Sequence, residues 1–312
     1  MNSNSASGRV WSPVVTPFQH GLSPDLPRYI EHCKWLVDND VGLAVFGTNS
    51  EANSLCVAQK QQLMDALIEA DVPGSLLMPG TGSCAIEDTV TLSRHALGAG
   101  CHGVLMLPPF YYKNVSDEGL FRYFAEVVER VGDAALKIYL YHIPPVAQVP
   151  ISLGLIERLR KAYPETFVGI KDSSGDWDNT RALIQTFAGD GFEVYTGNER
   201  FLLQTMREGG AGCISATANV NGRAIVALAK HWEADDADQA QLALNDTRDV
   251  FEGFPMIPAL KSAIADFRDS ADWCRVRPPL VSLNETQRHQ LAKALDEHGF
   301  SMLAKEHFDD TP

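Results

Sequence analysis

Apolar and polar positions repeat along the chain in a fixed order: a short apolar run, a polar turn, then apolar residues every three or four positions. Short apolar runs bounded by turn residues are typical of buried strands, and the wider spacing is typical of amphipathic helices. We therefore expect strand–helix units over about the first 230 residues. The expected strands cover residues 10–18, 41–46, 75–79, 103–107, 136–141, 167–171, 193–196 and 212–215.

Eight such units predict an α/β fold with a parallel sheet, and their number favours a (β/α)8 TIM barrel over an open, doubly wound sheet. No G-x-G-x-x-G motif follows the first strand, which argues against a dinucleotide site. Residues 9–233 are expected to form the barrel and residues 234–312 a C-terminal helical extension. Residues 1–8, rich in Ser and Asn, are expected to be a disordered arm.

Charge and composition narrow the class of protein. The net charge of −14 argues against nucleic acid and anionic membranes as partners. No apolar run reaches membrane-spanning length, and the N-terminus has no apolar stretch typical of a secretory signal. The six cysteines form no C-x-x-C pair, so we expect free thiols, a cytoplasmic location and no zinc site.

Lys171 ends the sixth expected strand, directly after Phe167-Val168-Gly169-Ile170. Lysine rarely ends a buried strand unless it is paired or used chemically. Burial disfavours the charged form of an amine, and a neutral amine can attack a ketone to form a Schiff base. The plainer alternative is a salt bridge to Asp172.

Three more strand ends carry polar or aromatic side chains, at residues 47–51, 108–112 and 139–144. The active site of such a barrel lies at the C-terminal ends of its strands. Tyr141 precedes Lys171 by 30 residues, one strand–helix unit, so the two should lie at the same height on adjacent strands. A phenol beside an amine can move the protons that imine chemistry requires.

These residues and their neighbours resemble the pyruvate-dependent class I aldolase and lyase family, which includes dihydrodipicolinate synthase and N-acetylneuraminate lyase. The similarity spans about residues 10–300, and its motifs, in order and at strand–helix spacing, are highly specific. The matching segments are Val14-Val15-Thr16-Pro17-Phe18, Gly47-Thr48-x-x-Glu51, Gly80-Thr81-Gly82, Pro109-x-Tyr111, Tyr141-x-Ile143-Pro144, Gly169-Ile170-Lys171-Asp172 and Gly210-x-Gly212-x-Ile214-Ser215.

The resemblance implies a role for each matching catalytic position. Lys171 corresponds to the Schiff-base lysine, and Tyr141 to the tyrosine that acts as general acid and base. Thr48 corresponds to the threonine of a proton relay. Tyr111 corresponds to the relay tyrosine that reaches in from a neighbouring subunit. The resemblance therefore also implies a homotetramer, built as a dimer of dimers, and no cofactor.

The substrate-binding residues implied by the resemblance are Thr48, Asn49, Ile214 and Val146. Backbone amides of Thr48 and Asn49 would hold the pyruvate carboxylate, although Ser50 stands where the family usually has glycine. Val146 stands where lysine-pathway synthases place an arginine for the carboxylate of aspartate semialdehyde. A valine cannot pair with a carboxylate, so we expect a less charged second substrate and no efficient dihydrodipicolinate synthesis.

Two neighbouring residues are expected to have structural roles. His142 follows Tyr141 and should point the opposite way on its strand, so we expect it to be packed. Glu51 is expected to begin a helix or to partner a nearby group, and not to act as a base.

The sequence thus predicts an enzyme, a class I aldolase or lyase that makes or cleaves a carbon–carbon bond between pyruvate and an aldehyde. Asn49 and Lys171-Asp172-Ser173 are also similar to the 4-hydroxy-2-oxoglutarate lyases of this family. One alternative is a dehydratase of a deoxy-keto sugar acid that uses the same imine. Another is a catalytically silent paralogue that binds a keto acid, against which the four catalytic residues argue.

Overall fold

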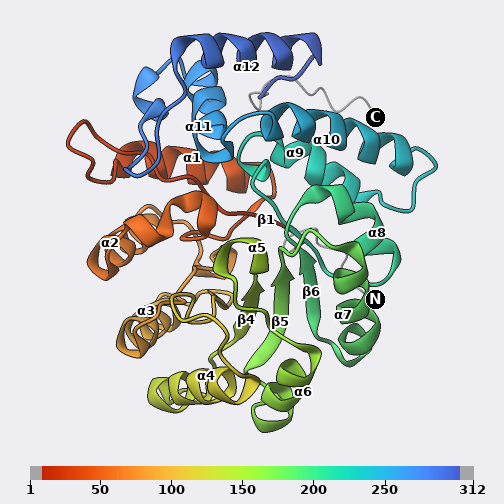
Figure 1. Cartoon of the computed structure of the whole chain (residues 1–312). Helices are drawn as coiled ribbons and strands as arrows, with labels where there is room; N and C mark the ends of the chain where they lie inside the picture. Colours follow the sequence, from red (N-terminus) through yellow and green to blue (C-terminus); the bar gives the residue numbers. More distant parts are fainter. Residues whose placement is uncertain (1–8, 303–312) are drawn as a thin grey trace.

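The computed structural model describes residues 9–302, in which helices surround a ring of parallel strands (Figure 1). The expected arm at 1–8 and the end of the expected extension at 303–312 lie outside the described residues. The strands are β1 (Val10–Ser12), β2 (Gly42–Leu43), β3 (Val104–Met106), β4 (Ile138–His142), β5 (Phe167–Asp172), β6 (Glu193–Thr196) and β7 (Gly212–Ile214).

These strands pair in the order β2-β1-β7-β6-β5-β4-β3, all in parallel. The expected strand at 75–79 closes the ring between β2 and β3 through single bridges and not as a regular strand. Met78 N donates to Leu43 O at 2.9 Å, and Leu105 N donates to Pro79 O at 2.9 Å. The beginning of this segment is instead a 3-10 helix, Gly74–Leu76, and Pro79 has no N–H to donate. The TIM barrel expected from the sequence is thereby confirmed.

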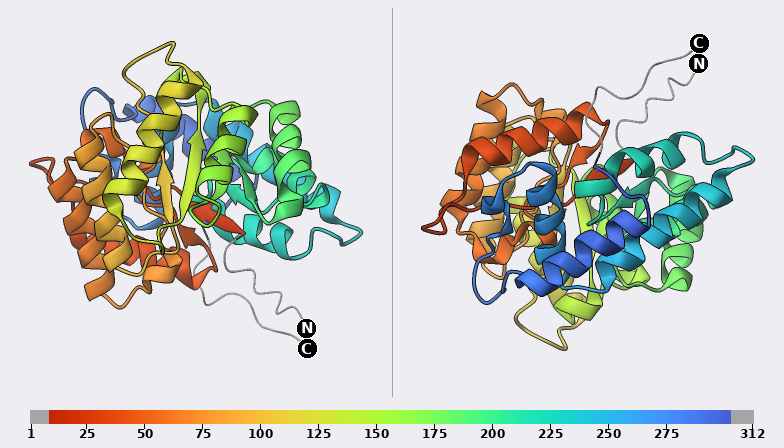
Figure 2. Two further views of the ribbon diagram at one scale, coloured as in Figure 1. Left: turned by 90° about the horizontal axis from the view of Figure 1, so that it is seen from below. Right: turned by 90° about the horizontal axis from the view of Figure 1, so that it is seen from above.

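The helices form the outer layer, and Figure 2 shows them on every side of the strands. The barrel helices are α1 (Leu26–Asp38), α2 (Val57–Glu69), α3 (Ile86–Gly98), α4 (Asp117–Val131), α5 (Pro144–Ala147), α6 (Leu153–Ala162), α7 (Trp177–Phe187), α8 (Leu202–Arg207) and α9 (Ala218–Lys230). The helices that follow are α10 (Ala237–Glu252), α11 (Met256–Phe267) and α12 (Glu285–Glu297).

Alternation along the strands decides which side chains face the barrel interior. Tyr139 and Tyr141 of β4 pack in an interior cluster with Trp11, Tyr195 and other strand residues. Their partners in register on β5 are Gly169 and Lys171. A Cβ at Gly169 would lie 2.5 Å from the Tyr139 ring, so only glycine fits there. The same alternation brings Lys171 to the inner face, two residues beyond Gly169 along β5.

The helices α10 to α12 share a second apolar core and cover the side of the barrel formed by α1 and α9 (Figure 1). His32 of α1 lies at this joint, fully buried. Its ring stacks on Trp35 at 5.7 Å between centroids and meets the edge of Trp273 at 5.3 Å. Its Nε2 lies 3.4 Å from Asn219 Oδ1 on α9. Burial and the nearby Arg268 charge lower the pKa of His32 to about 3.

No helix within residues 9–302 is both long and apolar enough to cross a membrane.

Candidate active site

A cavity of about 270 Å³ opens at the C-terminal ends of the strands. It brings together Thr48, Asn49, Tyr141 and Lys171, which the sequence had placed on three separate strand ends. The remaining lining residues are Ile143, Ser173, Gly175, Gly197, Asn198, Ala216, Arg248 and Met256.

Lys171 is 2% exposed and lies beside Tyr141. The two residues are direct partners in the β4–β5 register, and Lys171 Nζ lies 4.4 Å from the centroid of the Tyr141 ring. Among the residues that the structure describes, no hydrogen bond or ion pair joins Lys171 to Asp172. The Asp172 carboxylate instead accepts hydrogen bonds from Asn179 Nδ2 at 3.0 Å and Thr180 Oγ1 at 2.6 Å. The salt-bridge alternative for Lys171 is therefore not what the geometry shows.

Thr48 connects to this pair through Tyr141. Its Oγ1 lies 3.0 Å from Tyr141 Oη, within hydrogen-bond distance. Thr48 begins a short 3-10 helix, Thr48–Ser50, and the first amides of a helix have no partner inside it. Within the described residues, neither Thr48 N–H nor Asn49 N–H donates to another backbone carbonyl.

Ser50, which replaces the family's usual glycine, is accommodated without backbone strain. The left-handed residues of this turn are Phe46 (φ 62°) and Glu51 (φ 56°), and Ser50 is not among the positive-φ positions. The Ser50 hydroxyl accepts a hydrogen bond from Gly47 N at 3.1 Å, and its carbonyl accepts one from Thr16 Oγ1 at 2.8 Å. The substitution thus adds a hydrogen bond that stabilises the turn.

Glu51 fixes the other end of this turn through an ion pair that the sequence did not reveal. Its carboxylate pairs with Lys261 of α11, and both side chains are fully buried. The second carboxylate oxygen accepts from Arg277 N at 2.8 Å, and Lys261 Nζ also donates to Arg275 O at 2.7 Å. Burial lowers the pKa of Lys261 to about 8, although the Glu51 charge opposes this shift. The expectation that Glu51 partners a nearby group is confirmed.

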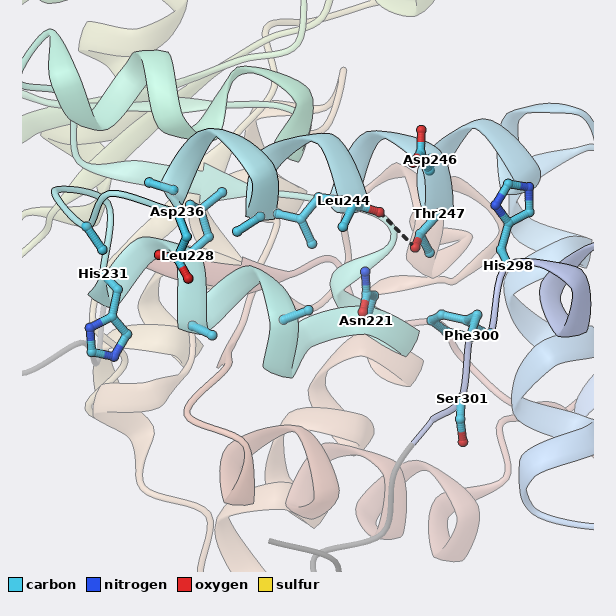
Figure 3. A pocket seen from close by; sticks show the side chains of 17 residues that line it. Asn221, Leu228, His231, Asp236, Leu244, Asp246, Thr247, His298, Phe300 and Ser301 are labelled. Atoms are coloured by element: carbon cyan, nitrogen blue, oxygen red, sulfur yellow. Dashed lines mark hydrogen bonds between the residues drawn. The ribbon is translucent and has the colours of Figure 1, made fainter. Parts of the chain in front are cut away.

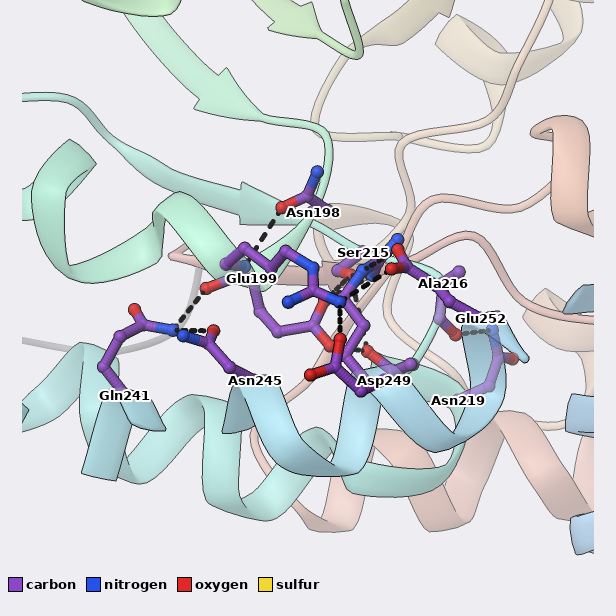
Figure 4. A network of polar contacts seen from close by, with 12 residues as sticks. Asn198, Glu199, Ser215, Ala216, Asn219, Gln241, Asn245, Asp249 and Glu252 are labelled. Carbon is purple, nitrogen blue, oxygen red and sulfur yellow. Dashed lines mark hydrogen bonds and ion pairs between the residues drawn. The ribbon is translucent and has the colours of Figure 1, made fainter. Parts of the chain in front are cut away.

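Arg248 of α10 enters the cavity from the C-terminal helices, and sequence reasoning missed it. Figure 4 shows the polar network of Glu199, Ser215 and Glu252, the three residues that Arg248 contacts. Its Nη1 donates to Glu199 Oε2 and its Nε to Glu252 Oε1, both at 2.7 Å. Its one sequence signal is a charged residue on the buried stripe of α10, at helical spacing from Leu244 and Phe251.

Three of the expected site residues do not line the cavity in the single subunit. Tyr111 is 75% exposed and packs edge-on against Tyr112, at 5.4 Å between ring centroids. Val146 of α5 is 62% exposed. Ile214 is fully buried in the interior cluster of the barrel.

His142 is packed, as expected. It is buried, and its Nδ1 accepts a hydrogen bond from Ile151 N at 3.0 Å.

A larger cavity, with a volume of about 710 Å³, lies between α9, α10 and residues 298–301 (Figure 3). Its lining combines six alanines and the apolar residues Leu228, Leu244 and Phe300 with polar residues such as His231 and Asp236. Among the described residues that line it there is no lysine or tyrosine, so the smaller cavity around Lys171 is the candidate active site. Nowhere in residues 9–302 do three His, Cys, Asp or Glu side chains gather as a metal site would require.

Comparison with known proteins gives concordant matches along nearly the whole chain. A model of the dihydrodipicolinate synthetase family matches residues 6–298. An uncharacterized DapA-like lyase from Chloroflexus aurantiacus is 31% identical over 291 residues, which cover 91% of this chain and 95% of that protein.

Two solved structures also match this chain along nearly its whole length. Dihydrodipicolinate synthase from Agrobacterium tumefaciens superposes with a TM-score of 0.86 at 32% identity, covering 93% of this chain and 99% of that one. YagE from E. coli K12, solved in complex with pyruvate, gives a TM-score of 0.84 at 27% identity, covering 94% and 99% of the two chains.

Proposed function

Because the chain belongs to the dihydrodipicolinate synthetase family, a family of lyases and aldolases, we propose that it is a class I aldolase or lyase that acts on pyruvate through a Schiff base. The observation that supports this most is the buried Lys171 amine beside Tyr141, whose hydroxyl lies 3.0 Å from Thr48 Oγ1. The pyruvate held by YagE supports the choice of keto acid.

In the proposed reaction, the Lys171 amine attacks the C2 carbonyl carbon of pyruvate, and the resulting carbinolamine loses water to give the imine. Loss of a proton from C3 gives an enamine, whose C3 then bonds to the carbonyl carbon of an aldehyde. The aldehyde oxygen takes up a proton, and water hydrolyses the imine to release the product and free Lys171. Read backwards, the same steps cleave a 4-hydroxy-2-keto acid.

Tyr141 is the proposed proton carrier, since it is the register partner of Lys171 on the adjacent strand and its ring centroid lies 4.4 Å from the amine. Thr48 would pass the proton onward, and Tyr111 of a neighbouring subunit would complete the relay. The exposure of Tyr111 in the single subunit fits a residue that is used across an interface. We therefore propose a homotetramer in which each site is shared by two subunits.

The proposed second substrate is an aldehyde other than aspartate semialdehyde. Val146 offers no charge to a carboxylate, and its exposed side chain lies outside the lining of the cavity. The Agrobacterium relative carries the name of the synthase, so direct comparison of aspartate semialdehyde with other aldehydes is the decisive assay for this part.

Covalent trapping tests the proposed mechanism. Incubation with pyruvate and borohydride should add one reduced pyruvate to each subunit, and peptide mass spectrometry should locate it on Lys171. Lys171→Ala should abolish the adduct. Lys137→Ala is the matched control, because Lys137 immediately precedes β4 and lies at the opposite end of the barrel. No adduct on the wild-type protein, or an adduct on another lysine, would overturn the proposal.

A further inference from the structure

Arg248 is a fixed hydrogen-bond donor inside the cavity that holds Lys171. Its side chain is nearly buried, and two of its three guanidinium nitrogens are engaged. Nε donates to Glu252 and Nη1 to Glu199, with Nη1 also 3.2 Å from Ser215 Oγ. Within the described residues, Nη2 makes no hydrogen bond. One amino group of a held guanidinium is therefore available to a ligand.

Glu199 holds this guanidinium in place. The Glu199 carboxylate is fully buried, and it also accepts hydrogen bonds from the hydroxyls of Ser215 and Thr217. If the Arg248 guanidinium moved away, the buried Glu199 carboxylate would keep only hydroxyl partners, which costs free energy. The guanidinium cannot swing away to follow a substrate, so its donor defines a fixed position at the cavity wall.

The charges around Arg248 favour a neutral ligand group. Glu252 also pairs with Arg200, which in turn pairs with Asp249. Three carboxylates thus surround two guanidiniums, and the cluster carries a net negative charge. A carboxylate on the second substrate would be repelled by this negative charge. A hydroxyl or ether oxygen would accept a hydrogen bond from Arg248 without that repulsion.

The other polar side chains of this wall are uncharged. Asn198 uses its Oδ1 to accept from Arg200 N at 3.0 Å, so its amide nitrogen is the group left to donate. Ser173 adds a hydroxyl to the same lining. Asn198 and Ser173 thus offer uncharged donors beside the Arg248 guanidinium, whose charge is neutralised by its carboxylate partners. Together they form a surface suited to hydroxyl groups.

We infer that Arg248 is a specificity-determining residue, which binds an oxygen of an uncharged, hydroxylated aldehyde as it meets the pyruvate enamine. This inference rests on the proposed imine chemistry and names the class of its second substrate. A site built to hydrogen-bond a hydroxyl discriminates strongly against an analogue that lacks it.

The test compares three aldehydes with pyruvate as the partner: glyceraldehyde, propanal and succinic semialdehyde. For the wild-type protein, kcat/KM should be highest with glyceraldehyde. Arg248→Lys keeps a positive charge beside Glu199 but lacks the second amino group. It should lower kcat/KM for glyceraldehyde about 10- to 100-fold, and that for propanal by less than about threefold.

Arg207→Lys is the matched control, because Arg207 pairs with Asp238 of the same helix α10 at 2.9 and 2.8 Å but lies outside the cavity. It should leave all three values within about twofold. Borohydride trapping of pyruvate on Arg248→Lys should match that of the wild-type protein, which reports that Lys171 and the fold are intact.

Equal losses for glyceraldehyde and propanal in Arg248→Lys, with trapping unchanged, would overturn the inference. A wild-type preference for succinic semialdehyde would overturn it as well, since a carboxylate would then be the recognised group. A wild-type protein that traps no pyruvate would instead refute the imine chemistry on which the inference rests.

Discussion

At the scale of residues, the site consists of a small set of inward-facing side chains whose positions follow from strand register. Tyr139 and Tyr141 alternate with outward residues on β4, and Gly169 and Lys171 do so on β5. A lysine held in such surroundings, 2% exposed and with an aromatic ring 4.4 Å from its nitrogen, is enclosed far more than a surface lysine. Its register partner Tyr141 is therefore the proton carrier that we propose.

The role of Tyr141 can be tested without knowing the aldehyde. Formation of the enamine removes a proton from C3 of pyruvate, so an active site should exchange the methyl protons of pyruvate with deuterium from D2O. Tyr141→Phe should slow this exchange, followed by NMR, by about 10²- to 10⁴-fold, because the ring remains while the proton carrier is lost.

Tyr163→Phe is the control for this experiment, since Tyr163 Oη donates to Glu129 at 2.9 Å on the outer surface of the barrel. It should exchange at the wild-type rate. Exchange by Tyr141→Phe within a few-fold of wild type would show that another group carries the proton.

At the scale of elements, local patterns predicted the repeating order and the tips of β4 and β5. The strands β1 and β2 are shorter than the predicted ranges 10–18 and 41–46, and long-range partners remained hidden. Lys171 and Tyr141 were identifiable because each stands at the tip of its own apolar run. Lys261 was not, because an apolar helix such as α11 gives no sign of which distant carboxylate a buried lysine meets. The third strand was predicted too regularly, since Pro79 limits its hydrogen bonding to single bridges.

The joint between α1 and the C-terminal helices should be sensitive to acid through His32. Its pKa in the folded protein, about 3, lies below its ordinary value of 6.5. Between these values the unfolded chain binds the proton and the folded one does not. Above pH 6.5 His32 therefore does not penalise the folded state. As the pH falls below 6.5, the free energy of unfolding decreases by up to about 1.4 kcal/mol per pH unit.

His32→Gln should weaken this dependence. Between pH 6.5 and 5, where most carboxylates are still ionised, its melting temperature should fall less steeply than that of the wild-type protein. His20→Gln changes an exposed histidine and should follow the wild-type curve. Parallel curves for all three proteins would show that His32 is protonated without cost in the folded state.

At the scale of the whole molecule, one subunit supplies an incomplete set of the proposed catalytic residues. Lys171, Tyr141 and Thr48 meet in one cavity, whereas Tyr111 faces outward with Tyr112, both of them largely exposed. Two exposed tyrosines packed edge to edge are a typical anchor for an interface. The distribution of residues thus supports a shared site and an oligomer.

Mixing two inactive variants tests this assembly. Tyr111→Phe lacks the residue donated to the neighbour, and Lys171→Ala lacks the imine lysine. If the sites are shared, unfolding and refolding the two together should restore about a quarter of the wild-type exchange activity, because half of the random pairs are mixed and each has one intact site.

A mixture of Tyr141→Phe with Lys171→Ala is the control and should stay inactive, since both residues belong to the same subunit's cavity. Light scattering of the wild-type protein should give the mass of a tetramer. A fully active monomer would contradict the shared site.

The buried ion pair between Glu51 and Lys261 also orders events during synthesis. The two residues are 210 positions apart, so Glu51 leaves the ribosome long before its cation has been translated. Until α11 emerges, the turn that carries Thr48 and Asn49 has a carboxylate that must stay hydrated. A nascent barrel can therefore assemble its strands early, but the turn proposed to bind pyruvate gains its buried counter-charge only after residue 261 has been translated.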